Sequence, residues 1–200
     1  MVSDRYRDIV SDSVTRAVEA HLADRLGAQP QRASVTFLGV EPIDVLRFVT
    51  GTDVVFVTVG CARHPMSDPL DLHADPVRGP RAEIVVRMHA GAPLRGLHKR
   101  MATIAAAPAV EGLILRDDAL IDLSEPLWDV AACTAFLLEP DDLGPCPLPE
   151  PMEPVEFIRA VPITANEAAW VRLKGAGALR EAWSEADIDV RASDRAQAQL

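Results

Sequence analysis

Residues 53–59 read Asp-Val-Val-Phe-Val-Thr-Val, an almost wholly apolar run that is followed by Gly60. A short apolar run rich in β-branched residues is typical of a strand that is buried on both faces. Residues 43–49 come shortly before it and also place apolar side chains on both faces of an alternating pattern. Because Gly51-Thr52-Asp53 supplies turn chemistry between the two runs, we expect a hairpin at the centre of a sheet.

Periodic apolar segments elsewhere predict further helices and strands around this hairpin. Apolar residues at helical spacing predict an N-terminal helix at 4–26 and a second helix at 94–107, which Pro108 should end. The capping box Thr164-Ala-Asn-Glu167 predicts the start of a C-terminal helix. Further strands are expected at residues 34–38, 82–89, 112–115, 119–122, 134–138 and 155–161, the last of them stopped by Pro162.

These elements are expected to form one domain over residues 1–200. A chain of this length can bury a single core, and 48% of its residues are apolar. Six prolines between Pro140 and Pro154 exclude a helix or a central strand there, so we interpret this segment as an extended crossover within the domain. The prediction is an α/β fold in which helices flank a central mixed β-sheet, with the core at 34–189 and a frayed C-terminal tail at 190–200.

The composition excludes several classes of protein. A net charge of −10 argues against a nucleic-acid binder, which would carry a basic surface. No apolar run reaches the roughly 18 residues of a membrane helix, and residues 1–8 lack the apolar core of a signal peptide. We therefore expect a soluble cytoplasmic protein with neither nucleic acid nor membrane as a partner. The widely spaced Cys61, Cys133 and Cys146 predict free buried thiols.

Most of the negative charge is confined to residues 110–156, which hold twelve acidic residues and one basic residue. Two interpretations remain open: a solvated loop surface, or a docking face that attracts a basic partner. The candidate residues for such a face are Asp117, Asp118, Asp141 and Asp142. Trp128 lies in the same segment and is either a partly exposed anchor for a partner or a core residue.

Residues 62–81 show neither a strand period nor a helix period. A structureless segment of this length is uncommon inside a compact domain and is often functional when it occurs. Its candidate contact residues are His64, Asp68, Asp71 and His73. With Asp75, the same imidazole and carboxylate groups could hold zinc or manganese, so a metal site is the alternative to a polar loop. A nucleophilic pair of Cys61 and His64 is a further alternative, although no third orienting group is evident.

Motifs that indicate catalysis or a cofactor are not evident in the sequence. The segment Lys174-Gly-Ala-Gly-Ala-Leu179 lacks the third glycine of a dinucleotide fingerprint and follows a helical segment in place of a strand. No phosphate-binding loop, nucleophile elbow or HExxH sequence occurs. We therefore expect no cofactor.

Three segments, in this order, resemble the Suppressor of fused (SUFU) domain family. They are residues 55–60 with the polar loop that follows, residues 81–88, and residues 155–167 running into a helix. The chain is similar to the bacterial single-domain type over residues 35–189. The resemblance implies a protein-binding module with a mixed α/β fold and no known catalysis. Bacterial members are thought to act often as immunity proteins against toxins, whereas the eukaryotic member is a two-domain regulator that clamps a peptide of a transcription factor.

The resemblance also implies where a partner binds. In the eukaryotic relative the peptide adds as a strand near the segments that match residues 55–60 and 155–161, and an acidic residue in the loop after the glycine assists. Asp68 and Asp71 are the acidic residues that the matching loop offers here. Such strand addition would give affinity through backbone hydrogen bonds.

The sequence thus predicts a non-enzymatic protein-binding module, an immunity or regulatory protein whose partner is a protein such as a basic toxin domain or an extended peptide. The alternative is a small metal-dependent enzyme that uses the 62–81 loop. A third hypothesis is a structural protein that self-associates through an exposed strand edge, and the oligomeric state stays open.

Overall fold

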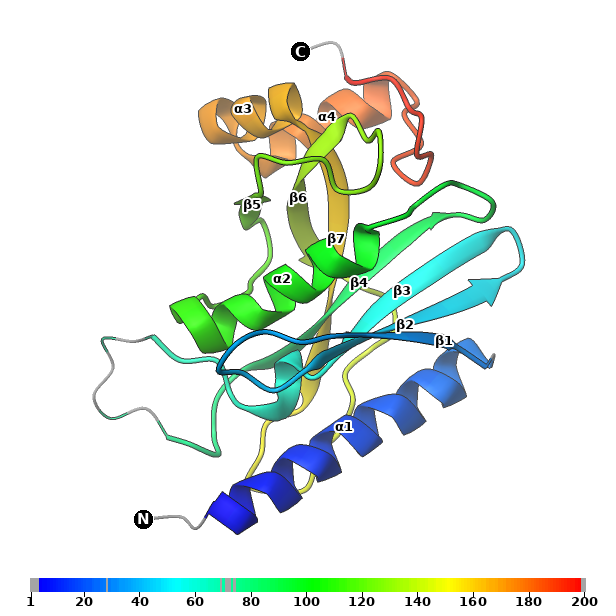
Figure 1. The fold of residues 1–200 in the computed structure, drawn as a ribbon. Helices are drawn as coiled ribbons and strands as arrows, with labels where there is room; N and C mark the ends of the chain where they lie inside the picture. Colours follow the sequence, from blue (N-terminus) through cyan, green and yellow to red (C-terminus); the bar gives the residue numbers. More distant parts are fainter. Residues whose placement is uncertain (1–3, 28, 69, 71–72, 74, 199–200) are drawn as a thin grey trace.

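The computed structural model describes residues 4–27, 29–68, 70, 73 and 75–198, with side chains from residue 11 onward (Figure 1). In chain order the elements are α1 (Asp4–Leu26), β1 (Gln31–Val35), β2 (Ile43–Thr50), β3 (Asp53–Val59), the 3-10 turn η1 (Cys61–Arg63), β4 (Arg81–His89), α2 (Leu97–Glu111), β5 (Leu120–Asp122), β6 (Cys133–Pro140), β7 (Val155–Thr164), α3 (Ala165–Lys174) and α4 (Ala176–Glu185). Within the described residues the strands form one sheet in the order β1-β2-β3-β4-β7-β6-β5.

The apolar run at residues 53–59 is the strand β3, and it lies inside the sheet between β2 and β4. The predicted hairpin with β2 is present, because Thr50 faces Asp53 across the turn. The strands β4 and β7 run parallel, and the other described pairings are antiparallel. The prediction of a mixed sheet in an α/β fold is therefore confirmed.

The sheet divides where β4 passes from one neighbour to the other. The first half of β4, Arg81–Val85, pairs with Val155–Arg159 of β7. Its second half, Val85–His89, pairs with Asp53–Val57 of β3. Beyond this junction β2, β3 and β4 turn away from β5, β6 and β7, so that two half-sheets diverge like the arms of a V (Figure 1).

Helices cover both faces of this divided sheet. The helix α2 packs on one face, while α1 covers the opposite face of the β1–β4 arm and α3 and α4 cover that face of the other arm. The apolar helix faces predicted from the sequence are buried, through Leu97, Met101 and Ile104 on α2 and Val14, Val18 and Leu22 on α1. None of the described helices has both the length and the apolar character needed to cross a membrane.

The helix α2 continues past Pro108, so the prediction that this proline ends it is wrong. A proline near the end of a helix removes a single hydrogen bond, and the last turn tolerates that loss. Gly112 ends the helix in a left-handed backbone conformation (φ 68°), and its N–H donates to the Pro108 carbonyl. Residues 112–115 form no strand, because the Leu115 N–H donates to the sulfur of Met66 and not to a neighbouring strand.

Two strand boundaries also differ from the prediction. β1 occupies residues 31–35, where it pairs with Ile43–Arg47 of β2. Phe37 of the predicted strand lies in the loop that follows and packs on the core. β7 extends past Pro162 to Thr164. The Pro162 carbonyl accepts a hydrogen bond from Arg195, so the missing N–H faces the opening of the V and costs no bond to β6.

The proline-rich segment between Pro140 and Pro154 connects β6 and β7. Leu143 and Cys146 in this segment are buried against α1. The C-terminal residues differ from the frayed tail that we expected, because the Arg191 carbonyl accepts from the His89 N–H (3.0 Å) and Ala198 is 4% exposed. The described residues up to 198 are therefore packed against the sheet, largely through charged side chains that an apolar pattern does not reveal.

Candidate functional site

A buried carboxylate fixes the turn at which the long loop leaves β3. The Glu83 side chain is fully buried and accepts hydrogen bonds from the Thr58 hydroxyl (2.6 Å) and the Gly60 N–H (2.8 Å). The N–H groups of Cys61 (3.3 Å) and Ala62 (3.1 Å) also donate to it. Burial raises the pKa of Glu83 to about 7, although these four donors oppose the rise. One side chain of β4 thus holds the start of the loop.

The buried guanidinium of Arg81 forms hydrogen bonds with the same loop near both of its ends. The Arg81 guanidinium donates to the carbonyls of Ala62 (2.7 Å) and Arg63 (2.8 Å) at the start of the loop, and to that of Val77 (3.0 Å) near its end. Arg81 is 1% exposed, and burial lowers the pKa of its guanidinium. Because a buried charge is costly unless it is well satisfied, two such groups at one loop base indicate that the position of the loop matters.

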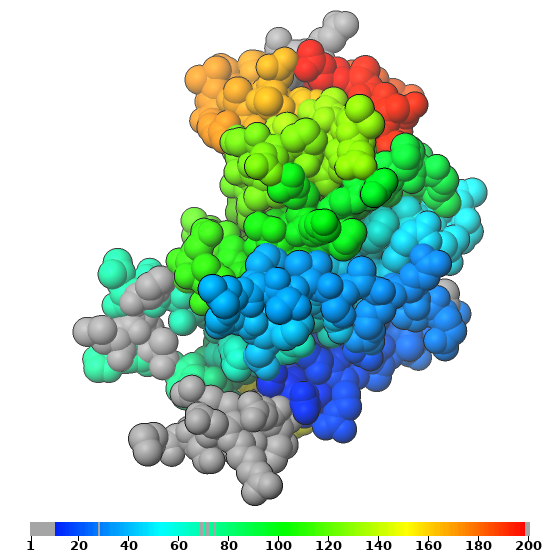
Figure 2. All heavy atoms as spheres, in the orientation of Figure 1, coloured from blue at the N-terminus to red at the C-terminus, as the bar shows by residue number. Residues whose placement is uncertain are grey.

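The described residues of the loop between 67 and 79 project from this base. The Met66 N–H donates to the Pro80 carbonyl (2.8 Å), and the Met66 side chain is buried. The beginning and the end of the loop therefore meet at its base. The described part beyond this closure reaches away from the rest of the molecule, beside the end of α2 (Figure 2). It therefore offers a protruding surface on a fixed base.

The predicted contact residues of the loop form no metal site in the part of the chain that the structure describes. Asp68 and Asp75 each accept from a backbone N–H two residues further along, an arrangement that shapes turns. His64 bonds to Glu41 (3.1 Å). His73 is exposed, and Asp71 lies outside the described residues. No group of three His, Cys, Asp or Glu that could hold a metal ion is found among the residues described.

The Cys61 thiol is unsuited to act as a nucleophile. Burial raises its pKa well above the ordinary value, so the reactive thiolate is not favoured. His64 bonds to Glu41, and no described hydrogen bond joins it to this thiol. The three cysteines are free and buried, as predicted.

Several segments meet beside the base of the loop. The β1–β2 loop, residues 60–65 and the C-terminal half of α2 surround a hollow of about 60 Å³ there. We call this region the apolar end, because these segments and the chain that continues from them carry exposed apolar residues: Leu38, Leu70, Val110, Leu113 and Ile114. Glu41 and His64 place polar groups at its margin. Sequence patterns miss this surface, because Leu113 and Ile114 read as the interior of a strand.

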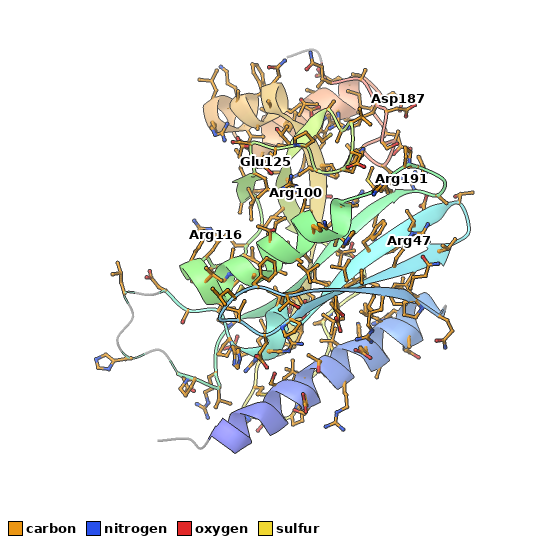
Figure 3. All side chains as sticks on the ribbon, in the orientation of Figure 1. Arg47, Arg100, Arg116, Glu125, Asp187 and Arg191 are labelled. Atoms are coloured by element: carbon orange, nitrogen blue, oxygen red, sulfur yellow. The ribbon has the colours of Figure 1, made fainter. Side chains whose placement is uncertain are left out.

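Arginines from other parts of the chain pair with most of the acidic residues of segment 110–156. Asp141, whose side chain is 1% exposed, accepts two hydrogen bonds from Arg87 on β4 (2.7 and 2.8 Å), and Asp142 contacts the same guanidinium. Figure 3 shows the similar pair of Arg100 and Glu125 between α2 and the β5–β6 loop. Seven of the twelve acidic residues form ion pairs: Asp118, Asp122, Glu125, Asp129, Glu139, Asp141 and Asp142.

The residues predicted to form the site therefore do not lie together in the folded chain. His64 lies at the base of the loop and lines the hollow of the apolar end, whereas Asp68 lies on the projecting part of the loop. Asp118 pairs with Arg180 of α4 (2.7 Å), away from that base, and Asp117 next to it is exposed. Trp128 is 5% exposed and packs in the core.

β3 is paired with β2 along its whole length and with β4 at Asp53–Val57. β7 is paired with β6 at Ile158–Thr164 but with β4 only at Val155–Arg159. Among the described residues, Ala160–Thr164 of β7 therefore have no strand partner on the side that faces the opening of the V. Addition of a partner strand, which the resemblance implies, stays a prediction.

Comparisons with known proteins match this fold. The family model for Suppressor of fused protein (SUFU) matches residues 39–196, whereas no curated protein matches the chain. A crystal structure of a putative SUFU homolog from Neisseria gonorrhoeae FA 1090 is 16% identical with a TM-score of 0.66, over 92% of this chain and 96% of that chain.

Two further solved structures share the fold at 16% identity. A Sufu–Fu complex has a TM-score of 0.64 over 92% of this chain and 91% of that chain. Drosophila Suppressor of Fused has a TM-score of 0.62 over 92% of this chain, which covers 51% of that longer chain. Because the family model spans most of its length, the chain belongs to the Suppressor of fused (SUFU) family.

Proposed function

We propose that this chain is a non-enzymatic protein-binding module whose partner docks on the apolar end. The observation that carries the proposal is the placement of exposed apolar side chains on the segments that meet at this end. Eight large apolar side chains are exposed among the described residues, and five of them belong to these segments and the chain that continues from them. Exposed apolar surface with polar groups at its margin is typical of a protein-binding site.

The fixed base of the loop supports the same proposal. Arg81 and Glu83 hold both ends of the loop, so the projecting part starts from a defined position. Leu70 on this part is 87% exposed. A loop that is positioned before binding loses less conformational freedom on association than a free loop does. The anchoring therefore suits a recognition surface.

The family supports a protein as the partner, since one of the similar structures is a Sufu–Fu complex. In its finer form, our proposal is that the chain acts as an immunity or regulatory protein for a partner such as a toxin domain. His64 would contribute a polar contact at the hollow and Asp68 one on the projecting loop. No described cluster of ligands favours the alternative of a metal-dependent enzyme.

Photocrosslinking in the native host tests this proposal and captures the partner in the same experiment. A photoreactive phenylalanine analogue replaces Leu38 or Val110 on the apolar end, or Leu173 on α3 as a control of similar exposure (105%, 60% and 73% exposed). We expect the same protein to be crosslinked from both apolar-end positions and not from the control. The absence of a crosslinked protein at Leu38 and Val110, or equal yields at Leu173, would contradict the proposal.

A further inference from the structure

A second surface lies at the opposite end of β4, where the two half-sheets diverge. It is a cleft of about 600 Å³, within the range of ligand-binding pockets. One wall is formed by His89 at the end of β4 and Pro93 in the turn that follows. Another wall is the β5–β6 loop at Trp128–Ala132. The C-terminal segment Ala192–Arg195 forms the third wall. α2 begins beside this cleft and ends at the apolar end, so the two surfaces are separated by the length of that helix.

Val130 on the rim of the cleft has a backbone conformation that disfavours its side chain. Its φ is +62°, and the Ala131 N–H donates to the Trp128 carbonyl (3.0 Å), which makes Val130 the third residue of a β-turn. This position with positive φ favours glycine or asparagine, and a β-branched residue there is strained. The Val130 side chain is nevertheless 100% exposed, so no packing within the chain compensates for the strain. Strain of this kind is concentrated at functional sites.

Among the charged side chains that line the cleft, the acidic ones are available to a partner. Both basic side chains in its walls already have acidic partners: His89 lies between Asp53 (2.9 Å) and Asp189 (2.7 Å), and the side chain of Arg195 is 5% exposed and paired with Glu167. The available carboxylates are Asp129 and Asp194. The side chain of Asp129 is 66% exposed and only distantly paired with Arg95 (3.7 Å), and exposed Asp194 forms no ion pair with a described residue.

Taken together, the strained apolar residue, the cleft and its available carboxylates point to a ligand. We propose that this cleft binds a basic segment of a protein partner, with Val130 packing on an aliphatic side chain and Asp129 and Asp194 facing its lysines or arginines. Opposite charges across such a contact favour the correct partner and speed its association. This proposal does not rest on the apolar end, and either surface could fail its test without the other.

The test is selection of 12-residue peptides from a random phage-displayed library against the full chain, followed by binding measurements with the selected peptides. We expect selected peptides to contain lysine or arginine beside aliphatic residues. Val130→Gly should weaken their binding about tenfold or more and yet raise the melting temperature of the protein by about 2–4 °C, because it removes both the contact and the strain. Val130→Asn, which tolerates positive φ, should weaken binding in the same way.

Asp129→Asn combined with Asp194→Asn should weaken the selected peptides and reduce the salt dependence of their binding. The control variant is Leu173→Ser on α3, which should leave peptide affinity unchanged. Recovery of no peptides, of peptides without a basic and aliphatic bias, or of peptides that bind Val130→Gly as tightly as wild type would overturn the proposal. Because Val130→Gly relieves strain, loss of binding in this variant is not a consequence of unfolding.

Discussion

Replacing Glu167 with glutamine removes the charge that secures the C-terminal segment to α3. The Glu167 side chain is fully buried and accepts two hydrogen bonds from Arg195 (2.7 and 2.8 Å). It also accepts from the indole N–H of Trp183 (3.0 Å) and from the N–H groups of Thr164 (2.8 Å) and Ala198 (3.2 Å). Both carboxylate oxygens contact the guanidinium, so either orientation of a glutamine amide would place an NH2 group against an N–H of Arg195.

The loss of stability expected from this change is about 3 kcal/mol. Breaking a buried ion pair by removing one partner costs about 3–5 kcal/mol, because the other charge stays buried. Burial raises the pKa of Glu167, but the bonds from Arg195, Thr164 and Trp183 outweigh it and lower that pKa from 4.5 to about 2. A shift of this size corresponds to roughly 3 kcal/mol of stability. Because the folded-state pKa lies below the unfolded one, this stability is present above pH 4.5 and is lost as the pH falls toward 2.

Urea unfolding at pH 7 and at pH 3 measures both effects. We expect Glu167→Gln to lower the free energy of unfolding by about 3 kcal/mol at pH 7 and by roughly half as much or less at pH 3. Glu181→Gln on the exposed side of α4 is the control, expected to change stability by less than about 0.5 kcal/mol. A double variant with Arg195→Met should cost less than the sum of the two single changes, because the pair is coupled. A Glu167→Gln protein as stable as wild type at pH 7 would refute the reasoning.

Two further predictions follow from the other buried carboxylates. The pKa of Glu83 is raised by burial to about 7, above its unfolded value, so its contribution is full below pH 4.5 and is lost as the pH rises through 7. Thermal unfolding should therefore show that Glu83→Gln loses less stability than wild type between pH 5 and pH 8, and an identical decline in both proteins would disprove this. Asp141→Asn removes the carboxylate that accepts two hydrogen bonds from Arg87, so it should lower the free energy of unfolding in urea by about 2–4 kcal/mol. The exposed Asp117→Asn is the control and should lower it by less than about 0.5 kcal/mol. Equal stabilities of these two variants would contradict the assignment of Asp141 as a structural partner of Arg87.

The parts of the fold that follow from local sequence signals were predictable. The α1 helix at 4–26 follows from apolar spacing, and the hairpin at 43–59 follows from two apolar runs around a glycine turn. The capping box of Thr164 and Glu167 is present with both of its hydrogen bonds. In each case the residues that decide the structure lie within a few positions of one another.

The features that escape prediction depend on contacts between distant segments. Arg87 and Asp141 are 54 residues apart, so a count of acidic residues in one segment overstates the charge that the surface displays. The divergence of β4 from β7 opens the cleft at Val130, and no local pattern encodes it. The apolar end likewise needs three segments to meet. Long-range pairing of this kind becomes visible only in the folded chain.

The most direct test of docking on the apolar end is to measure how its variants change the affinity for the partner that photocrosslinking identifies. In calorimetric titrations of the purified proteins, Leu38→Ser and Val110→Ser should each weaken binding about tenfold, since each removes an apolar contact worth roughly 1.5 kcal/mol. Leu173→Ser, which alters a similarly exposed leucine on α3, should stay within about twofold of wild type. Equal losses in all three variants, or no loss in the first two, would contradict docking on this end of the molecule.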